Sequence, residues 1–280
     1  MYNREIMRTS PEFPAFEDRF PELNQFIHEV VSEYRLGKIK SWDDLDESVN
    51  AFFTPEQMDK MEALVPGWCK MASYRHGVTL VHVLCVFLGL FMLPEFSALN
   101  PYQQGLIKWT VLLHDLEKEI DNGRRDPTHA FRSGASAAKR LASLGFSTIA
   151  DQQLLLDSWG ELTASSVTRL AADSEPVQDN QRLPEILRGI EMIFGKDSPA
   201  TLIVKTILLH MSINVVKEWP QAAPLSDREI TKNIDRDVLP LLRVMMLADN
   251  EGWVLFYTDD RSAQRAETLQ AFDRLSGMIL

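Results

Sequence analysis

The chain has 280 residues, of which 45% are hydrophobic, and its formal net charge is −11 at pH 7. Such a length and composition are typical of a soluble globular protein with a sizeable core. The acidic excess argues against sequence-independent binding of nucleic acid, which needs a basic surface. Cys69 and Cys85 have no CxxC spacing, and the first residues lack the apolar core of a signal peptide. We therefore expect free thiols and a cytoplasmic protein.

The first part of the chain, residues 1–70, contains little that suggests chemistry. Prolines interrupt its irregular start, and the spacing of apolar residues then predicts a helix over residues 22–34. Thr54 as a cap and Pro55 at the first helical position predict a second helix, which ends near Val65. We expect residues 1–70 to form a helical segment that packs on the rest of the protein.

Helical periodicity dominates the remaining chain. The apolar run Val78 to Leu93 is the only candidate membrane span, but it is too short to cross a bilayer comfortably and predicts a central core helix ended by Pro94. Further helices are expected at 101–120, 130–144, 183–194, 198–217 and 239–256. No stretch alternates cleanly enough to predict a sheet, and the polar residues 171–181 predict a loop. The expected fold is all-α, with residues 71–280 as a helical bundle.

The dipeptide His114-Asp115, which follows the mostly apolar run 106–113, is the strongest chemical signal. Adjacent side chains of a helix point about 100° apart, so these two can share an ion only if it lies over the face between them. Three of the other five histidines also lie in or beside helix-like segments: His82, His129 and His210. Together with an acidic residue these four histidines suggest a metal site.

Asp249 supplies that acidic residue, because it ends the apolar run 244–248, where a lone carboxylate is costly to bury without a cation or donor. Any one of these histidines alone would more often be a core residue with carbonyl partners. His28 lies outside the pattern. His76 stays open as a neighbour of the ligands, a residue that faces substrate, or the first ligand in place of His82.

The ordered series His82, His114-Asp115, His129, His210 and Asp249 resembles the ligand series of the HD superfamily of metal-dependent phosphohydrolases. The resemblance spans residues 76–256 and implies an HD-domain helical bundle with additional N-terminal helices. It also implies that His82, His114, Asp115 and Asp249 hold one ion, and that His129 and His210 share Asp115 to hold a second. The expected cofactor is one or two divalent ions; these ligand types suit Mn, Fe, Zn, Ni or Mg without choosing among them.

The resemblance implies hydrolysis of a small phosphorylated substrate by a metal-activated water. Asp115 would bridge the ions, and Lys118 would stabilise developing charge, since it occupies the lysine of the family's pattern His-Asp-hydrophobic-small-Lys. Glu117 stands where that pattern often has glycine. His210 is followed by methionine, and a Gly-Tyr-Pro signature is absent, so the cyclic-dinucleotide branch is not indicated.

Arginines near the predicted ligands are candidates for binding a substrate phosphate, because a guanidinium grips phosphate oxygens in a fork. Arg124 and Arg125 lie in a turn-rich connection, and Arg132 falls about one turn after His129. For each of them an ordinary solvated charge is an equal alternative. We favour Arg132, with Arg124 as the second choice.

Two other functions fit the same ligand order. Di-iron oxygenases that use this bundle to cleave carbon bonds share the six-ligand series, and Lys118 speaks mildly against that activity. A catalytically silent regulatory module would be suggested by loss of a ligand, whereas the set here is complete. We therefore favour the hydrolase, and expect no nucleic-acid or membrane partner.

Overall fold

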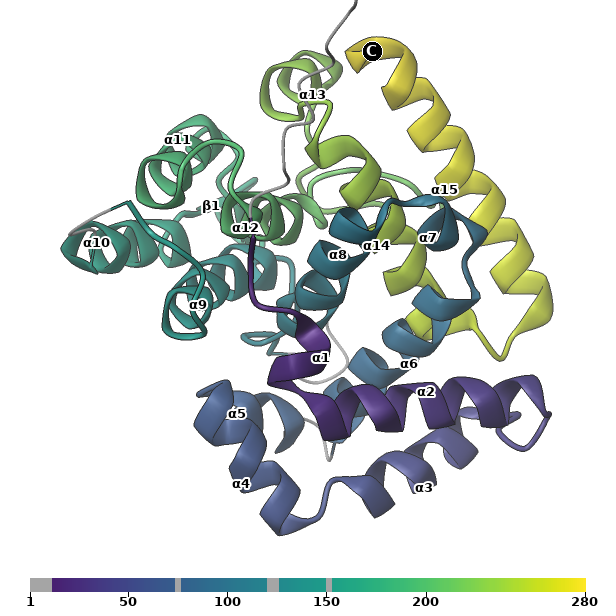
Figure 1. Cartoon of the computed structure of the whole chain (residues 1–280). Helices are drawn as coiled ribbons and strands as arrows, with labels where there is room; N and C mark the ends of the chain where they lie inside the picture. The colour runs from purple at the N-terminus through teal and green to yellow at the C-terminus, as the bar shows by residue number, and fades with distance from the viewer. Residues whose placement is uncertain (1–11, 74–76, 120–125, 150–152) are drawn as a thin grey trace, which may run out of the picture.

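The structure is a computed structural model that describes residues 12–73, 77–119, 126–149 and 153–280 (Figure 1). These residues form an all-α protein, as predicted. The helices are α1 (Phe16–Arg19), α2 (Pro21–Arg35), α3 (Trp42–Phe52), α4 (Pro55–Leu64), α5 (Trp68–Ser73), α6 (Val78–Met92), α7 (Pro94–Ala98), α8 (Pro101–Leu113), α9 (His129–Ser143), α10 (Gln153–Ala164), α11 (Leu183–Phe194), α12 (Pro199–Leu209), α13 (Asp227–Asn233), α14 (Val238–Val254) and α15 (Thr258–Ile279).

Helix α6 is the centre of the bundle. It is apolar on every side and buried from Thr79 to Leu90, as expected of a helix with neighbours all round. Its most extensive contact is with α14, and α2, α3, α5 and α8 pack around it (Figure 1). The prediction of a central core helix is confirmed. Within the described ranges, none of the helices has the length and apolar character needed to cross a membrane.

The N-terminal helices share the core of the bundle. The ring of Phe16 in α1 lies 5.6 Å from that of Phe87 in α6 and 6.0 Å from that of Trp109 in α8. The predicted cap at the start of α4 is present, because the N–H of Gln57 donates to the hydroxyl of Thr54 at 3.3 Å. Apolar burial, which grows with the area removed from water, therefore joins the two parts of the chain.

Two predicted helices end earlier than expected, and both end at a predicted metal ligand. α8 stops at Leu113 and α12 at Leu209, so that His114 and His210 are the residues that follow. After His114 the chain turns, with the N–H of Lys118 donating to the Asp115 carbonyl at 3.0 Å. The predicted ends at 120 and 217 were wrong because apolar residues continue past both turns.

A small hairpin corrects the expectation of no sheet. Strands β1 (Val167–Arg169) and β2 (Pro176–Gln178) pair antiparallel between α10 and α11. The predicted loop 171–181 therefore contains a strand. Three residues per strand are too few to produce a visible alternation, since that signal needs about four or more. Four helices of seven or more residues were also not predicted: α3, α10, α13 and α15.

Candidate metal centre

The structure brings the six predicted ligands together from five separate parts of the bundle. His82 lies in α6, His114 and Asp115 follow α8, His129 begins α9, His210 follows α12, and Asp249 lies in α14. The first five side chains are buried, and the Asp249 side chain is 23% exposed. Two groups of three could each hold a metal ion: His82, His114 and Asp249 in one, and Asp115, His129 and His210 in the other.

In the first group the Asp249 carboxylate faces two imidazoles. Its Oδ1 lies 3.0 Å from Nε2 of His82 and 3.7 Å from Nε2 of His114. Asp115 also reaches this group, because its Oδ2 lies 3.5 Å from Nε2 of His82 and 3.4 Å from Nε2 of His114. His82, His114, Asp249 and Asp115 itself therefore give the first group four residues with donor atoms.

In the second group the other oxygen of Asp115 takes part. Oδ1 lies 3.2 Å from Nε2 of His129, and that nitrogen lies 3.0 Å from Nε2 of His210. Asp115 thus has one carboxylate oxygen on each group. This is the arrangement in which a single carboxylate could bridge two ions.

Each imidazole is oriented by a main-chain carbonyl, so that Nδ1 is the protonated nitrogen. The Nδ1–H of His114 donates to Val111 at 2.8 Å, and that of His210 donates to Ile207 at 2.7 Å. His129 uses the Asp126 carbonyl at 2.6 Å. Nδ1 of His82 makes a longer contact of 3.4 Å with the Gly252 carbonyl. A neutral ring held in this way directs the Nε2 lone pair into the cluster, as metal-binding histidines do.

The cluster contains buried polar atoms that a cation could satisfy. Because His129 and His210 both carry their protons on Nδ1, two Nε2 lone pairs face each other at 3.0 Å. Nε2 of His114 and Oδ1 of Asp115 are buried without a hydrogen-bond partner. Two ligands about 2.1 Å from an ion and at a right angle to each other lie roughly 3.0 Å apart, so these donor distances fit a divalent metal.

Electrostatics keep the carboxylates ionised and at least two rings neutral. Burial raises the pKa of Asp115, but His114 and Lys118 outweigh it and hold that pKa well below its usual range. Burial likewise opposes ionisation of Asp249, but the nearby His114 and His82 rings hold the pKa of its carboxyl well below the usual range. Burial lowers the pKa of His82, and it lowers that of His210 to about 3. Neutral rings and ionised carboxylates are the states that metal ligands require. His114 departs from them: burial opposes its protonation, but Asp115 and Asp249 outweigh burial and raise its pKa, so a metal ion would have to compete with a proton at this ring.

Lys118 and Trp253 cover the first group. The Lys118 ammonium lies 2.6 Å from Oδ2 of Asp115 and 5.3 Å from the centre of the Trp253 ring. Trp253 stacks on the His82 imidazole, with ring centres 4.1 Å apart, and also on Trp42 of α3. Trp253 was not predicted. Its only sequence signal is its place one helical turn after Asp249, which puts both side chains on one face of α14.

Arg132 is close to the second group, but its guanidinium is engaged with protein atoms. It donates to the Asp126 carboxylate, to the hydroxyl of Thr128 and, at 2.8 Å, to the carbonyl of Glu117. Asp126 is the residue whose carbonyl orients His129. Arg132 therefore supports the turn that positions His129. This contribution of Asp126 was also not predicted.

Of the remaining candidates, only His28 lies in the described part of the chain. Arg124, Arg125 and His76 lie outside the described residues. His28 is exposed on α2, and its ring lies 5.0 Å from that of Phe91. It stays apart from the six ligands, in agreement with its exclusion from the sequence pattern.

We expect metal to stabilise the folded protein. Adding Mn²⁺ to metal-stripped protein at about 100 times its dissociation constant should stabilise by about 2.7 kcal/mol, because the unfolded chain lacks the site. That corresponds to a Tm rise of roughly 5 to 10 °C for a chain of this size, measurable by circular dichroism. His210→Gln should reduce the shift, whereas His28→Gln should keep it. An unchanged Tm with each of Mn²⁺, Fe²⁺, Zn²⁺ and Ni²⁺ would contradict this expectation.

Comparisons of the chain with protein-family models, with curated proteins and with solved structures found no match. Functional inference therefore depends on the geometry and chemistry of this cluster.

Proposed function

We propose that this protein is a metal-dependent phosphohydrolase that cleaves a phosphate ester of a small metabolite. The observation that carries the proposal is the pair of buried His/Asp groups joined through Asp115, with the ammonium of Lys118 beside the joining carboxylate. The order of the ligands along the chain, which resembles that of the HD superfamily, supports the same conclusion. The two His/Asp groups are compatible with the ion assignment expected from that resemblance.

The residues of the cluster suit a site for cations and phosphoryl groups. Two ionised carboxylates and one ammonium leave one uncompensated negative charge when the imidazoles are neutral, and this charge favours binding of dications. Divalent ions held there would lower the pKa of a water and withdraw charge from phosphoryl oxygens. Asp115 can serve both ions because its two oxygens face different groups.

Lys118 is the residue best placed to meet the substrate. Its side chain is 11% exposed, so the ammonium lies between the buried carboxylate and the outside. A phosphate ester that approaches the cluster would find this positive charge at its edge. The ammonium would stabilise negative charge that builds up on the transferring group or the leaving oxygen. The Trp253 ring limits the positions that the lysine side chain can adopt.

Lys118→Met should separate catalysis from metal binding. We expect kcat to fall about a hundredfold, the usual cost of removing one charge-stabilising donor, while metal content is retained. Lys70→Met is a matched control, because Lys70 is exposed and pairs with Glu117 and Glu119 outside the cluster. Full activity of Lys118→Met would exclude the assigned function of this lysine.

The proposed function is tested by elemental analysis together with an oxygen-free assay for phosphate release from 4-nitrophenyl phosphate. About two transition ions per chain and oxygen-independent release would support a two-metal hydrolase. Tightly bound iron with dioxygen uptake and no phosphate release would replace it with the oxygenase. Absence of bound metal after incubation with Mn²⁺ or Fe²⁺ would overturn both, and leave a module without catalysis.

A further inference from the structure

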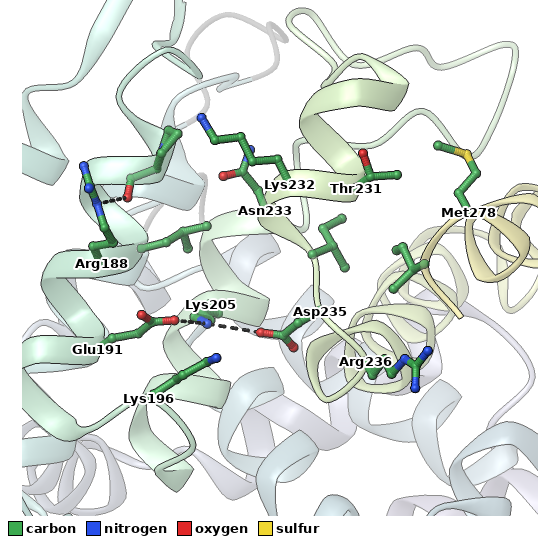
Figure 2. A pocket seen from close by; sticks show the side chains of 14 residues that line it. Arg188, Glu191, Lys196, Lys205, Thr231, Lys232, Asn233, Asp235, Arg236 and Met278 are labelled. Carbon is green, nitrogen blue, oxygen red and sulfur yellow. Dashed lines mark hydrogen bonds and ion pairs between the residues drawn. The ribbon is translucent and has the colours of Figure 1, made fainter.

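A second site is suggested by a pocket that does not involve the metal centre. It has a volume of about 640 Å³ and lies between α11, α12, α13 and the end of α15 (Figure 2). None of the six proposed metal ligands lines it. Its charged lining consists of Arg188, Lys196, Lys205, Lys232 and Arg236, together with Glu191 and Asp235.

The charge of this pocket is opposite to that of the chain. Five basic and two acidic side chains give it a formal charge of +3, whereas the whole protein carries −11. Concave surfaces lined by one sign of charge concentrate the electric field and attract the opposite ion. The pocket therefore favours an anion, although the protein as a whole repels one.

The floor of the pocket is built around a buried lysine. Lys205 in α12 is 3% exposed, and its ammonium lies 2.7 Å from the Glu191 carboxylate and 3.3 Å from that of Asp235. Figure 2 shows this lysine between its two partners. The two acidic side chains of the pocket are thus engaged with Lys205, which reduces their repulsion of an anion bound above them.

The walls supply cations with unused donors. The ammonium groups of Lys196 and Lys232 make no ion pair or hydrogen bond within the described part of the chain, and both side chains are exposed. Arg188 donates through Nε to the Pro184 carbonyl at 3.2 Å, which orients the guanidinium and leaves its terminal nitrogens available. Figure 2 shows Arg188 on the wall formed by α11 and Lys232 on the wall formed by α13. An arginine fork and separate ammonium groups are the side chains that bind phosphate oxygens.

Apolar side chains complete the lining. Leu187 and Ile234 are buried, and Met278 and Ile279 near the end of α15 are partly exposed. A lining that combines apolar surface with a few convergent polar groups is typical of small-molecule sites, and the volume falls within their usual range of about 300 to 1,000 Å³. The occupant should therefore have an apolar part as well as a charged part.

We infer that this pocket binds a small organic phosphate, with the phosphate between Arg188 and Lys232 and the apolar part over Leu187 and Ile234. The site is separate from the metal centre and goes beyond the proposed hydrolysis. Binding there needs no metal ion, because the pocket supplies its own positive charge. It also needs no turnover.

The test is calorimetric titration of metal-stripped protein with phenyl phosphate and with inorganic phosphate. The chelator must first be removed by desalting, since it is itself a polyanion. We expect one phenyl phosphate per chain, bound more tightly than inorganic phosphate. Arg188→Glu/Lys232→Glu should weaken binding about tenfold or more, because charge-assisted hydrogen bonds are lost. Arg188→Gln/Lys232→Gln should weaken it in the same direction with less disturbance of the surface.

Two controls distinguish this pocket from general attraction and from the metal centre. Lys38→Glu/Lys40→Glu makes the same change in net charge at exposed positions between α2 and α3, and should bind like the unchanged protein. Asp115→Asn should also bind phenyl phosphate normally in the absence of metal. No binding to the stripped protein, equal losses in both charge-reversed variants, or loss in Asp115→Asn would overturn the inference. None of these outcomes depends on phosphatase activity.

Discussion

Asp115→Asn is expected to remove metal binding from both groups at once and to lower turnover about a thousandfold or more. One Asp115 oxygen faces His129, while the other faces His82, His114 and the Lys118 ammonium. The neutral amide has a poorer ligand oxygen, and its NH₂ group cannot bind a cation. The substitution also leaves Lys118 without its anionic partner, although it changes the volume of the side chain very little.

The measurement is metal content by elemental analysis, with kcat for phosphate release recorded in parallel and circular dichroism used to verify folding. Asp249→Asn should reduce binding in the first group while the second keeps its ligands. Asp173→Asn, at an exposed position between β1 and β2, should change neither quantity. If folded Asp115→Asn protein retained two ions and full activity, Asp115 would not be the shared ligand.

Gly252→Ala is expected to disturb the candidate metal centre and destabilise the protein without changing any proposed ligand. Gly252 lies where α14 passes closest to His82, and an added Cβ would stand 2.5 Å from Cγ2 of Val86 and 2.8 Å from Cε1 of His82. Real side chains do not pack at such distances, so either the imidazole or the helix must move. We expect a loss of about 1–3 kcal/mol in the free energy of unfolding, the usual cost of overpacking, together with weaker metal binding.

Chemical denaturation and metal titration of the same samples would measure both effects. Gly277→Ala is the matched control, because Gly277 lies in α15 with nothing within 4 Å of the added Cβ. That substitution should be neutral or should stabilise by about 0.5–1 kcal/mol, as alanine does when it replaces a helical glycine. Equal stability and metal affinity in Gly252→Ala would mean that the contact between α14 and His82 is not rigid.

Much of the helical architecture could be predicted from local pattern. The run 78–93 is too apolar for a surface helix and too short for a membrane span, and it became the buried helix α6. Helix boundaries were less predictable. Apolar residues continue beyond Leu113 and Leu209, so periodicity alone could not reveal that the chain turns at His114 and His210. The hairpin was missed because its strands are only three residues long.

The candidate site, like the helices, could be predicted from the sequence only in part. Residue type, apolar context and the resemblance to the HD ligand series selected six candidate ligands, since histidine and aspartate are costly to bury without a partner. The structure places these six side chains close together. Trp253 and Asp126 could not be selected, since each acts through another residue. Trp253 stacks on the His82 ring, and the Asp126 carbonyl accepts a hydrogen bond from His129. Trp253 and His82 are far apart in the chain, so no local pattern relates them. Asp126 is only three residues before His129, but it acts through its main-chain carbonyl, which residue type does not reveal.

The sequence by itself determined that the protein is helical and which helix lies at its centre, and it indicated which histidines and aspartates could hold a cation. The resemblance implied two groups that share Asp115. Only the tertiary structure could show that the candidate ligands lie in two groups, that the two oxygens of Asp115 face different groups, and that a basic pocket lies elsewhere. The physical reason is the distance along the chain over which each effect acts. Burial preferences and helical periodicity are properties of neighbouring residues, whereas donor distances of about 3 Å depend on how α6, α8, α9, α12 and α14 pack against one another.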